Sequence, residues 1–191
     1  MVAARQRWRA QAAHLDGTRL VFVDETAVQT KLTRRYGRSP RGTRLVAPVP
    51  HGHWKTTTVV AALRADGLTA PLVLDGPLDG PAFVAYVEQL LAPPLRPGDA
   101  VVLDNLACHK VAGVRPAIEA VGARVLYLPP YSPDFNPIEQ VFAQLKARLR
   151  AVAPRTVGRL WPAVGWALAA VSPTACANYV RHAGYRLATT E

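Results

Sequence analysis

The sequence predicts a single α/β domain, in which helices flank a mixed β-sheet. Two observations predict this fold class. Apolar runs rich in β-branched residues come first and are separated only by turn signals, and later apolar runs alternate with helix-spaced segments. Strands joined by short turns pair antiparallel, whereas strand-helix-strand units add parallel strands to the same sheet. The 191 residues, half of them hydrophobic, suffice for one domain with a real core.

The first half of the domain is predicted to consist mainly of strands. Residues 1–17 form an N-terminal arm or short helix, and residues 18–24 (Thr-Arg-Leu-Val-Phe-Val-Asp) form a strong strand that ends in an acid. Residues 43–49 and 55–63 are expected to complete an antiparallel meander, because turn signals separate them. Residues 68–74 are expected to add an edge strand.

The second half alternates helices and strands. Asp79-Gly-Pro81 opens a helix that reaches about Leu91, and Ser172-Pro173 opens the last helix. The remaining expected elements are strands at 100–104 and 124–128 and helices at 111–121, 137–152, 155–171 and 173–183. We therefore expect a main domain of residues 18–152 and a C-terminal helical extension of residues 153–191.

The charge of the chain is strongly positive and unevenly distributed. The formal net charge is +10, and residues 31–44 and 146–159 hold six and five basic residues and no acid. Such clusters attract a polyanion, most often nucleic acid, although a solvated basic face is the alternative. The N-terminus has no secretory h-region, the apolar run 164–171 is too short to span a bilayer, and the two cysteines lack metal-ligand spacing. We expect a cytoplasmic, nucleoid-associated protein with no membrane partner.

A proline-rich segment, Leu128-Pro-Pro-Tyr-Ser-Pro-Asp-Phe-Asn-Pro-Ile-Glu139, is the most informative part of the chain. Its prolines favour an extended path with few backbone donors. Asn136 stands where a helix N-cap belongs, and Pro137 stands where the first helical residue belongs. The segment is therefore predicted to fix the direction of the Glu139 carboxylate.

Three carboxylates are candidates for one site. Asp24 and Asp104 each follow an apolar strand, and Glu139 begins the helix after the last strand. In open α/β sheets, sites form at the carboxyl ends of strands. Three converging carboxylates require a cation, and hard oxygen ligands select Mg²⁺ or Mn²⁺. Two such ions catalyse phosphoryl displacement, so the acids and the basic clusters together predict phosphodiester chemistry.

Each of these acids also has an ordinary structural explanation. Asp24 could end a strand, with its neighbour Glu25 facing the site instead, because alternation lets only one of them do so. Asp104 could cap a turn, and Glu139 could serve the helix dipole. Asp134 is a rival third acid, but it precedes the expected helix cap.

Three segments resemble the signature blocks of the DDE transposases, most of all the bacterial insertion-sequence branch of the mariner superfamily. They are Val21-Phe-Val-Asp-Glu25, Leu103-Asp-Asn-Leu-Ala-Cys-His-Lys110 and the proline-rich segment. Between Asp104 and Glu139 lie 34 residues, the spacing for which that superfamily is known. The resemblance extends over about residues 18–150.

The resemblance implies an RNase H-like fold in which Asp24, Asp104 and Glu139 bind two Mg²⁺ ions, with Mn²⁺ as a substitute. It implies DNA cleavage at transposon ends, transfer of the freed 3′-hydroxyl to target DNA, and action as a homodimer on DNA. Relatives carry a helix-turn-helix region before the first strand. Because 17 residues are too few for such a unit, we expect either a separately encoded helix-turn-helix domain or a truncated chain.

Further residues are predicted to contact DNA or support the site. The DNA-binding candidates are Arg34, Arg35, Arg38 and Arg41 in a basic hairpin loop, and Lys146 and Arg150 on one stripe of the helix that Glu139 begins. The supporting candidates are Glu25, Asn105 and His109, although Asn105 and His109 could also serve only to stabilise their loop. Trp54 and Tyr131 are candidates for stacking on a base, with packing as the favoured role of Trp54.

Two other functional classes compete with a transposase. A non-catalytic DNA-binding or dimerisation module derived from a transposase would be expected to lack one of the acids, and all three are present. Another RNase H-like nuclease, such as a junction resolvase, would lack the proline-rich segment. A metal-dependent DNA strand transferase is therefore the favoured function.

Overall fold

A five-stranded mixed sheet forms the centre of the molecule, as predicted. The computed structural model describes residues 1–51 and 55–187. The strands are β1 (Leu20–Gln29), β2 (Thr56–Arg64), β3 (Gly67–Asp75), β4 (Ala100–Leu103) and β5 (Arg124–Tyr127). Their order in the sheet is β3-β2-β1-β4-β5. The first three strands pair antiparallel, and β4 and β5 add parallel to β1.

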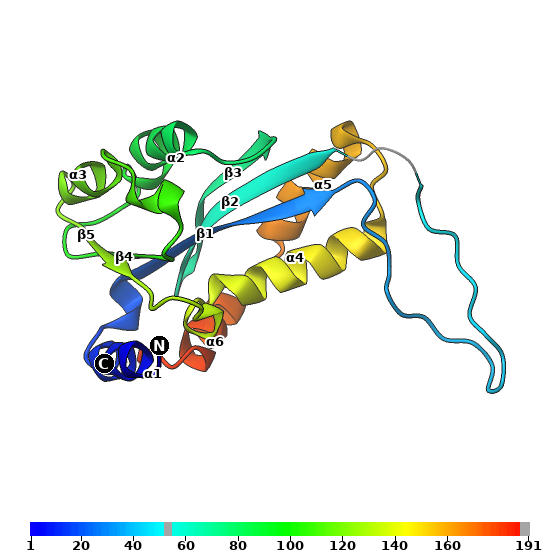
Figure 1. Cartoon of the computed structure of the whole chain (residues 1–191), viewed down its shortest axis with the longest axis horizontal. Helices are drawn as coiled ribbons and strands as arrows, with labels where there is room; N and C mark the ends of the chain where they lie inside the picture. Colours follow the sequence, from blue (N-terminus) through cyan, green and yellow to red (C-terminus); the bar gives the residue numbers. More distant parts are fainter. Residues whose placement is uncertain (52–54, 188–191) are drawn as a thin grey trace.

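Helices cover both faces of this sheet (Figure 1). One face carries α2 (Gly80–Tyr86), its continuation η2 (Val87–Leu91) and α3 (Val114–Glu119). The other face carries α1 (Val2–Ala12), α4 (Ile138–Val152), α5 (Val157–Ala169) and α6 (Pro173–His182). Short 3₁₀ turns are η1 (Gly17–Arg19), η3 (Ala107–Lys110) and η4 (Pro133–Phe135).

The first half of strand β1 is a nearly continuous apolar run because its two faces lie in different core clusters. Leu20 and Phe22 belong to the core cluster beneath α4, whereas Val21 and Val23 belong to the cluster beneath α2 and α3. All four side chains are buried because helices cover both sides of the strand. The first acid of the chain therefore follows a strand that is fixed on both faces.

The predicted helix starts at Asp79 and Ser172 are confirmed. The Asp79 carboxylate accepts a hydrogen bond from the backbone N–H of Ala82 at 2.9 Å, and Ser172 Oγ accepts one from Ala175 at 3.2 Å. These are N-cap contacts, which satisfy backbone donors that the first helical turn leaves free. The helix that Asp79 opens ends in a π-turn, η2.

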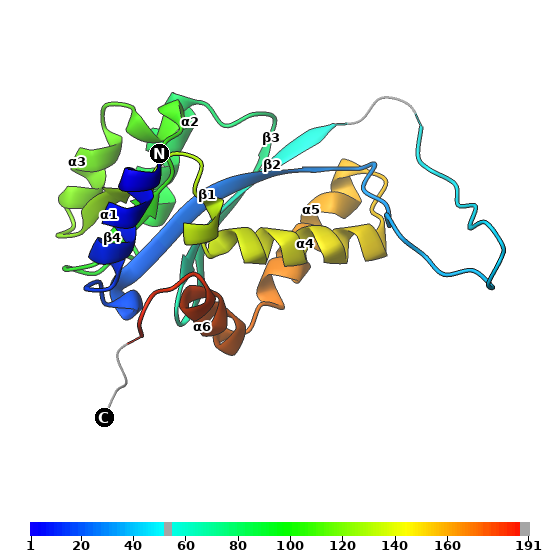
Figure 2. The ribbon, with the colours of Figure 1, turned by 60° about the horizontal axis from the view of Figure 1, so that its bottom comes forward.

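The predicted strand at residues 43–49 is wrong. This stretch belongs to the long connection from β1 to β2, which projects away from the sheet (Figures 1 and 2). Gln29 at the end of β1 pairs with Thr56 at the start of β2, so β2 occupies the place beside β1 that the predicted strand would need. A strand-forming sequence needs a partner strand, and residues 43–49 have none among the described residues. Val46 is accordingly 84 % exposed.

The predicted end of the first strand at Asp24 is also wrong, because β1 continues to Gln29. Residues from Asp24 onward pair with β2, with Asp24 opposite Ala61. Only the pairing with β4 stops earlier, at Phe22. Asp24 therefore lies in the middle of a strand, at the point where its parallel neighbour ends.

Helices α5 and α6 pack into the core cluster beneath α4 through Leu160, Val164, Cys176 and Val180. In the described residues, no single helix has the length and apolar composition to cross a membrane, although α5 and α6, which meet at a 77° bend, reach these limits as a pair.

Trp54 lies outside the described residues, so its predicted role stays a prediction.

Candidate active site

The register of the sheet brings Asp24 and Asp104 to the same level. Phe22 on β1 is paired with Val102 on β4. Two residues further along each strand are Asp24 and Asp104, which therefore lie side by side where the parallel pairing ends. Parallel neighbours in register present equivalent positions at the same height of a sheet. Two acids that are 80 residues apart in sequence thus meet at one edge.

Glu139 joins them from the first turn of α4. Together the three carboxylates line a pocket of about 450 Å³. The remaining walls come from the loop after β4 and from the proline-rich segment, including Leu106, Pro130 and Tyr131. The pocket is thus built from two strands and one helix, and its acids come from three distant parts of the sequence.

Asp24 is the most buried of the three acids, with 8 % of its surface exposed. One of its carboxylate oxygens accepts a hydrogen bond from the backbone N–H of Glu25, and the other accepts one from Asn136 Nδ2, both at 2.9 Å. Burial raises the pKa of Asp24 to about 7, helped by the negative charges of Glu25, Asp104 and Glu139. The pocket therefore concentrates negative charge that lacks a cation among the described residues that line it.

Asp104 is held in place by a buried histidine, His109. Its Oδ1 accepts hydrogen bonds from the backbone N–H of Leu106 at 2.9 Å and contacts His109 Nδ1 at 2.6 Å. His109 Nε2 in turn contacts Glu25 Oε2 at 3.0 Å. Burial opposes charge on His109, but the hydrogen bonds to Asp104 and Glu25 outweigh it and raise the pKa of His109 to about 9. His109 therefore bridges two carboxylates, and both of them favour its protonated form.

Asp24 and Glu25 point to opposite faces of the sheet, as the alternation of side chains along a strand requires. Asp24 lines the pocket with Asp104, whereas Glu25 points to the face beneath α2 and contacts His109. Cys108 lies close to the same pair, with its Sγ within 4.8 Å of ligand atoms of Glu25 and His109. Both ring nitrogens of His109 already contact carboxylates, so this trio does not offer the free imidazole nitrogen that a metal requires.

Asn136 does not have the predicted N-cap role. The helix begins at Ile138, Pro137 occupies the cap position, and no side chain caps the helix. Asn136 is 3 % exposed, and its amide donates to Asp24 across 112 residues of sequence. The proline-rich segment therefore aims two side chains at the pocket, Glu139 and Asn136, and the second of these orients the first acid of the site.

Contacts from both ends of the chain hold the proline-rich segment. Arg5 of α1 forms two hydrogen bonds with Asp134, at 2.8 and 2.6 Å, and a third with Ser132 Oγ at 2.9 Å. Tyr185 donates its hydroxyl hydrogen to the carbonyl of Phe135 at 2.7 Å and accepts from Trp8 Nε1 at 3.1 Å. These contacts were absent from the sequence prediction, and they explain why the rival acid Asp134 faces α1 and does not line the carboxylate pocket.

Removing the Tyr185 hydroxyl tests this support. We expect Tyr185→Phe to lower the free energy of unfolding by about 1–3 kcal/mol, because it leaves the buried Phe135 carbonyl and Trp8 indole unpaired. For a chain of this size the melting temperature should fall by roughly 2–12 °C. Thermal unfolding followed by circular dichroism measures the shift.

Tyr179→Phe is the matched control, because Tyr179 is only partly buried and its hydroxyl has no hydrogen bond to the described residues. That variant should melt within about 2 °C of the unmodified chain, since such substitutions stay near ±0.5 kcal/mol. Equal melting temperatures for the two variants would show that the Tyr185 hydroxyl does not support the segment.

The four arginines predicted in a basic loop do lie in one. We define the basic loop as residues 30–51, the described part of the connection from β1 to β2. Arg34, Arg35, Arg38 and Arg41 are all exposed there. Arg155 anchors the base of this loop by donating to the carbonyls of Thr30 and Leu32 at 3.1 and 2.8 Å.

Helix α4, whose first turn carries Glu139, runs toward the base of the basic loop (Figure 2). Lys146 and Arg150 are partly exposed on this helix, seven and eleven residues beyond Glu139. That spacing keeps them on the stripe of Glu139. The structure therefore aligns the predicted cationic residues between the pocket and the loop.

Asn105 and Tyr131, which also line the carboxylate pocket, differ in their contacts and exposure. The Asn105 amide donates to the carbonyl of Leu128, which ties the loop after β4 to the loop after β5. Tyr131 is 84 % exposed at the mouth of the pocket and has a positive φ of 53°. Asn105 thus stabilises its loop, whereas the ring of Tyr131 is free to contact a bound molecule.

The fold and the carboxylate pocket define a class of protein, the RNase H-like domains that carry acids on a mixed sheet. Residues 19–160 match the family described as DDE superfamily endonuclease. This match covers most of the chain, and the chain belongs to that family. A comparison with curated proteins found no match.

Solved structures with this fold include those of the Mos1 transposase. The pre-cleavage Mos1 transpososome aligns with a TM-score of 0.74 at 15 % identity, over 94 % of this chain and 57 % of that chain. The Mos1 strand transfer complex aligns with a TM-score of 0.72 at 16 % identity, over 94 % and 56 %. The catalytic domain of Mos1 mariner transposase gives 0.62 at 14 %, over 94 % and 84 %. The chain has the fold of that catalytic domain and spans little more than half of the longer Mos1 chains.

Proposed function

We propose that this chain is the catalytic domain of an insertion-sequence transposase, which cleaves DNA at transposon ends and transfers the strand to target DNA. The observation that carries the proposal is the pocket in which Asp24, Asp104 and Glu139 converge from β1, β4 and α4. The match to the endonuclease family and the basic surfaces support it. The Mos1 structures named above are of a transposase in DNA-transposition complexes, which agrees with this assignment.

The pocket fits divalent magnesium. Its donors are three carboxylates, which are the hard oxygen ligands that Mg²⁺ and Mn²⁺ prefer. The raised pKa of Asp24 reflects burial beside other negative charges, and a bound cation would relieve this repulsion. Mos1 paired-end complexes have been solved with Mn and with Mg. Two Mg²⁺ ions held there would supply Lewis-acid stabilisation of the charge that develops on the phosphodiester.

The residues of the chain prepare this site in three ways. Asn136 and the Glu25 amide hold the two oxygens of Asp24, which leaves its direction fixed. His109 holds Asp104 and is itself anchored by Glu25. Groups held in advance need no reorganisation when charge develops on the substrate. The cations of the basic loop and of α4 would bind the DNA backbone on the approach to the pocket.

Nicking of supercoiled plasmid DNA tests the proposal without knowledge of the transposon ends. We expect the full chain to convert supercoiled plasmid to the nicked form in Mg²⁺ or Mn²⁺ and to be inactive with EDTA. An anomalous signal from Mn²⁺ between Asp24, Asp104 and Glu139 in crystals would locate the metal directly. A chain that binds DNA but neither nicks it nor binds Mn²⁺ would favour the non-catalytic module instead.

The basic loop is expected to contribute affinity without sequence preference. Replacing Arg34, Arg35, Arg38 and Arg41 with alanine should weaken binding to any duplex, because phosphate contacts carry no base information. The slope of log K against log salt should become shallower by up to about 3.6, since each lost contact contributes about 0.9. Fluorescence anisotropy of two unrelated labelled duplexes across a salt series measures both effects.

Arg96→Ala is the control for this series, because Arg96 is exposed in the loop before β4, away from the basic loop. Its salt slope should match that of the unmodified chain. An unchanged slope in the fourfold variant would contradict a role of the basic loop in DNA binding.

We also propose partners for the whole assembly. The chain acts as a homodimer on DNA, together with a helix-turn-helix domain encoded separately, at the nucleoid in the cytoplasm. Light scattering of the chain with and without DNA distinguishes a DNA-dependent dimer from a monomer.

A further inference from the structure

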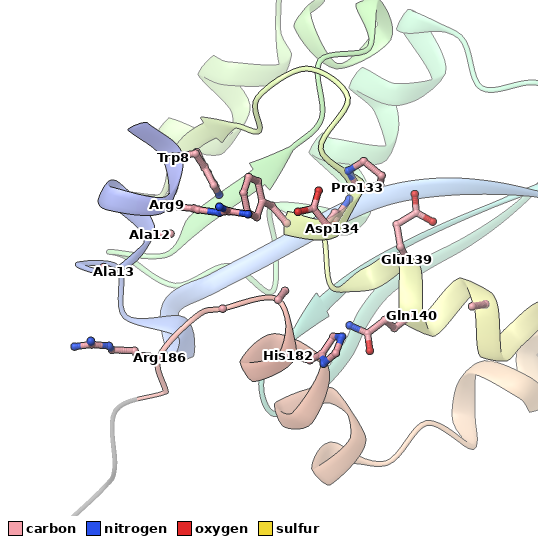
Figure 3. A pocket seen from close by; sticks show the side chains of 15 residues that line it. Trp8, Arg9, Ala12, Ala13, Pro133, Asp134, Glu139, Gln140, His182 and Arg186 are labelled. Atoms are coloured by element: carbon pink, nitrogen blue, oxygen red, sulfur yellow. The ribbon is translucent and has the colours of Figure 1, made fainter. Parts of the chain in front are cut away.

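A second cavity adjoins the carboxylate pocket. It is a groove of about 750 Å³ between α1, the start of α4 and the segment that follows α6 (Figure 3). Pro133, Asn136 and Glu139 line both the groove and the carboxylate pocket. A molecule that is bound at the carboxylates can therefore continue into the groove past Glu139 without leaving the protein surface.

Small residues keep this groove open. Residues without bulky side chains line it on three sides: Ala12, Ala13, Ala143, Ala183 and Gly184. They come from α1, from α4 and from the segment after α6, so the open space results from three separate elements. A larger side chain at Ala143, which is exposed on α4, would narrow the groove without entering the core.

Basic residues line the groove together with two acids, Asp134 and Glu139. Arg9, His182 and Arg186 line it; in Figure 3 Arg9 extends from α1 toward Asp134, whereas the end of the Arg186 side chain extends away from Asp134 and Glu139. Arg5 neutralises Asp134 through its two hydrogen bonds and holds the pKa of that carboxyl below its ordinary value. Within residues 1–51 and 55–187, neither Arg9 nor Arg186 forms an ion pair. Two arginines without an ion pair among these residues thus line the groove, and the guanidinium of Arg9 also lies over the Phe135 ring, 5.5 Å from its centroid.

We propose that this groove binds the phosphodiester backbone of a single DNA strand where that strand leaves the carboxylate pocket. The proposal rests on the proposed function, and it adds a binding site for the strand beyond the scissile phosphate. Arg9 and Arg186 would bind phosphates, while Gln140 and His182 offer N–H donors along the same wall. The occupant is a single strand because the cations and the alanines surround a cavity of about 750 Å³, which has room for a backbone but not for a duplex.

Site-specific crosslinking tests where the DNA lies. Benzoylphenylalanine is placed at Ala143 in the full chain, which is then irradiated with a labelled 3′-tailed duplex in Ca²⁺. We expect a crosslink to the single-stranded tail from position 143 and none from the same probe at Arg96. A crosslink from position 143 to a second protein chain, in place of DNA, would overturn the proposal.

Reversing the charge of two arginines in the groove provides a second test of the proposal. Arg9→Glu combined with Arg186→Glu should reduce the crosslink yield at least tenfold. It should also make the salt slope for a single-stranded oligonucleotide shallower by about 1.4, since each single-strand contact contributes about 0.7. Arg96→Glu combined with Arg124→Glu adds the same charge at exposed sites elsewhere and should change neither value.

The failures of the groove and of the proposed function are distinguishable. DNA that crosslinks to a probe at Arg38 but not at position 143, in a chain that still nicks plasmid, overturns the groove and leaves the function intact. A chain whose basic loop crosslinks to DNA but which never nicks plasmid overturns the function, and a crosslink at position 143 in that chain would still confirm the groove.

Discussion

Replacing Glu139 with glutamine is expected to remove Mg²⁺-dependent DNA nicking while the chain stays folded. The substitution keeps the shape of the side chain but removes one of the three negative charges that line the pocket. Metal ions contribute several kcal/mol of charge stabilisation in such reactions, so the rate should fall by roughly 10²–10⁴-fold. Initial rates of plasmid nicking at saturating Mg²⁺ measure the effect.

Thermal unfolding separates this explanation from damage to the fold. The charge of Glu139 is one of the causes that raise the pKa of Asp24, so Glu139 and Asp24 repel each other in the absence of metal. In EDTA, the melting temperature of Glu139→Gln should therefore equal or exceed that of the unmodified chain. Added Mg²⁺ should raise it less, because a ligand at free concentration L stabilises the folded state by RT ln(1 + L/Kd) and the loss of one carboxylate raises the Kd for Mg²⁺.

Glu119→Gln serves as the control, because Glu119 is an exposed acid of α3 that pairs with Arg115 of the same helix. It should nick plasmid at the unmodified rate. Full activity of Glu139→Gln would remove Glu139 from the site, and Asp134→Asn would then be the next variant to compare.

The sequence predicted the central strands because their apolar runs are a local pattern. The acids were predicted to converge because Asp24 and Asp104 directly follow such runs and Glu139 begins the helix after the last strand. Apolar runs such as Val21–Val23 and Val101–Leu103 are buried on both faces, which left little choice but central strands. Asp24 lies beside Asp104 in the pocket even though its strand was predicted to stop at Asp24. Its place beside Asp104 depends on the register between β1 and β4, and the stretch of β1 beyond Asp24 does not alter that register.

The errors come from features that depend on distant neighbours. Residues 43–49 have a strand-forming composition, but β2 already occupies the place beside β1. Asn136 precedes a helix, which locally predicts an N-cap, yet its amide donates to Asp24, 112 residues away. Local sequence records the propensity of a residue, whereas only the folded chain decides which partner the side chain reaches.

The contacts around the proline-rich segment extend this point to the whole chain. Arg5 and Tyr185 hold the segment from sequence positions 127 and 50 residues away, measured to Ser132 and Phe135. No spacing or motif marks either residue. These two contacts therefore had no signal in the sequence, because they join segments that are close only in the folded chain.

The largest effect on stability is expected from Asp99→Ala. Asp99 is fully buried at the start of β4 and accepts hydrogen bonds from both terminal nitrogens of Arg64, at 2.7 and 3.3 Å. It also accepts one from the Arg96 amide at 2.9 Å. Its removal leaves the guanidinium of Arg64, 6 % exposed at the end of β2, without its partner. Breaking a buried pair in this way costs about 3–5 kcal/mol.

The melting temperature of Asp99→Ala should therefore fall by about 6–20 °C. Asp66→Ala is the matched control, since Asp66 lies 3.7 Å from Nε of the same arginine but its side chain is 67 % exposed. Exposed pairs contribute at most about 1 kcal/mol, so Asp66→Ala should melt within roughly 4 °C of the unmodified chain. Similar losses in the two variants would mean that solvent reaches Arg64. Asp99 lies at the end of β4 opposite Asp104. The folded fraction of Asp99→Ala should therefore keep the proposed Mn²⁺ binding of the unmodified chain, which separates the stability of the sheet from the chemistry proposed at the other end of its strands.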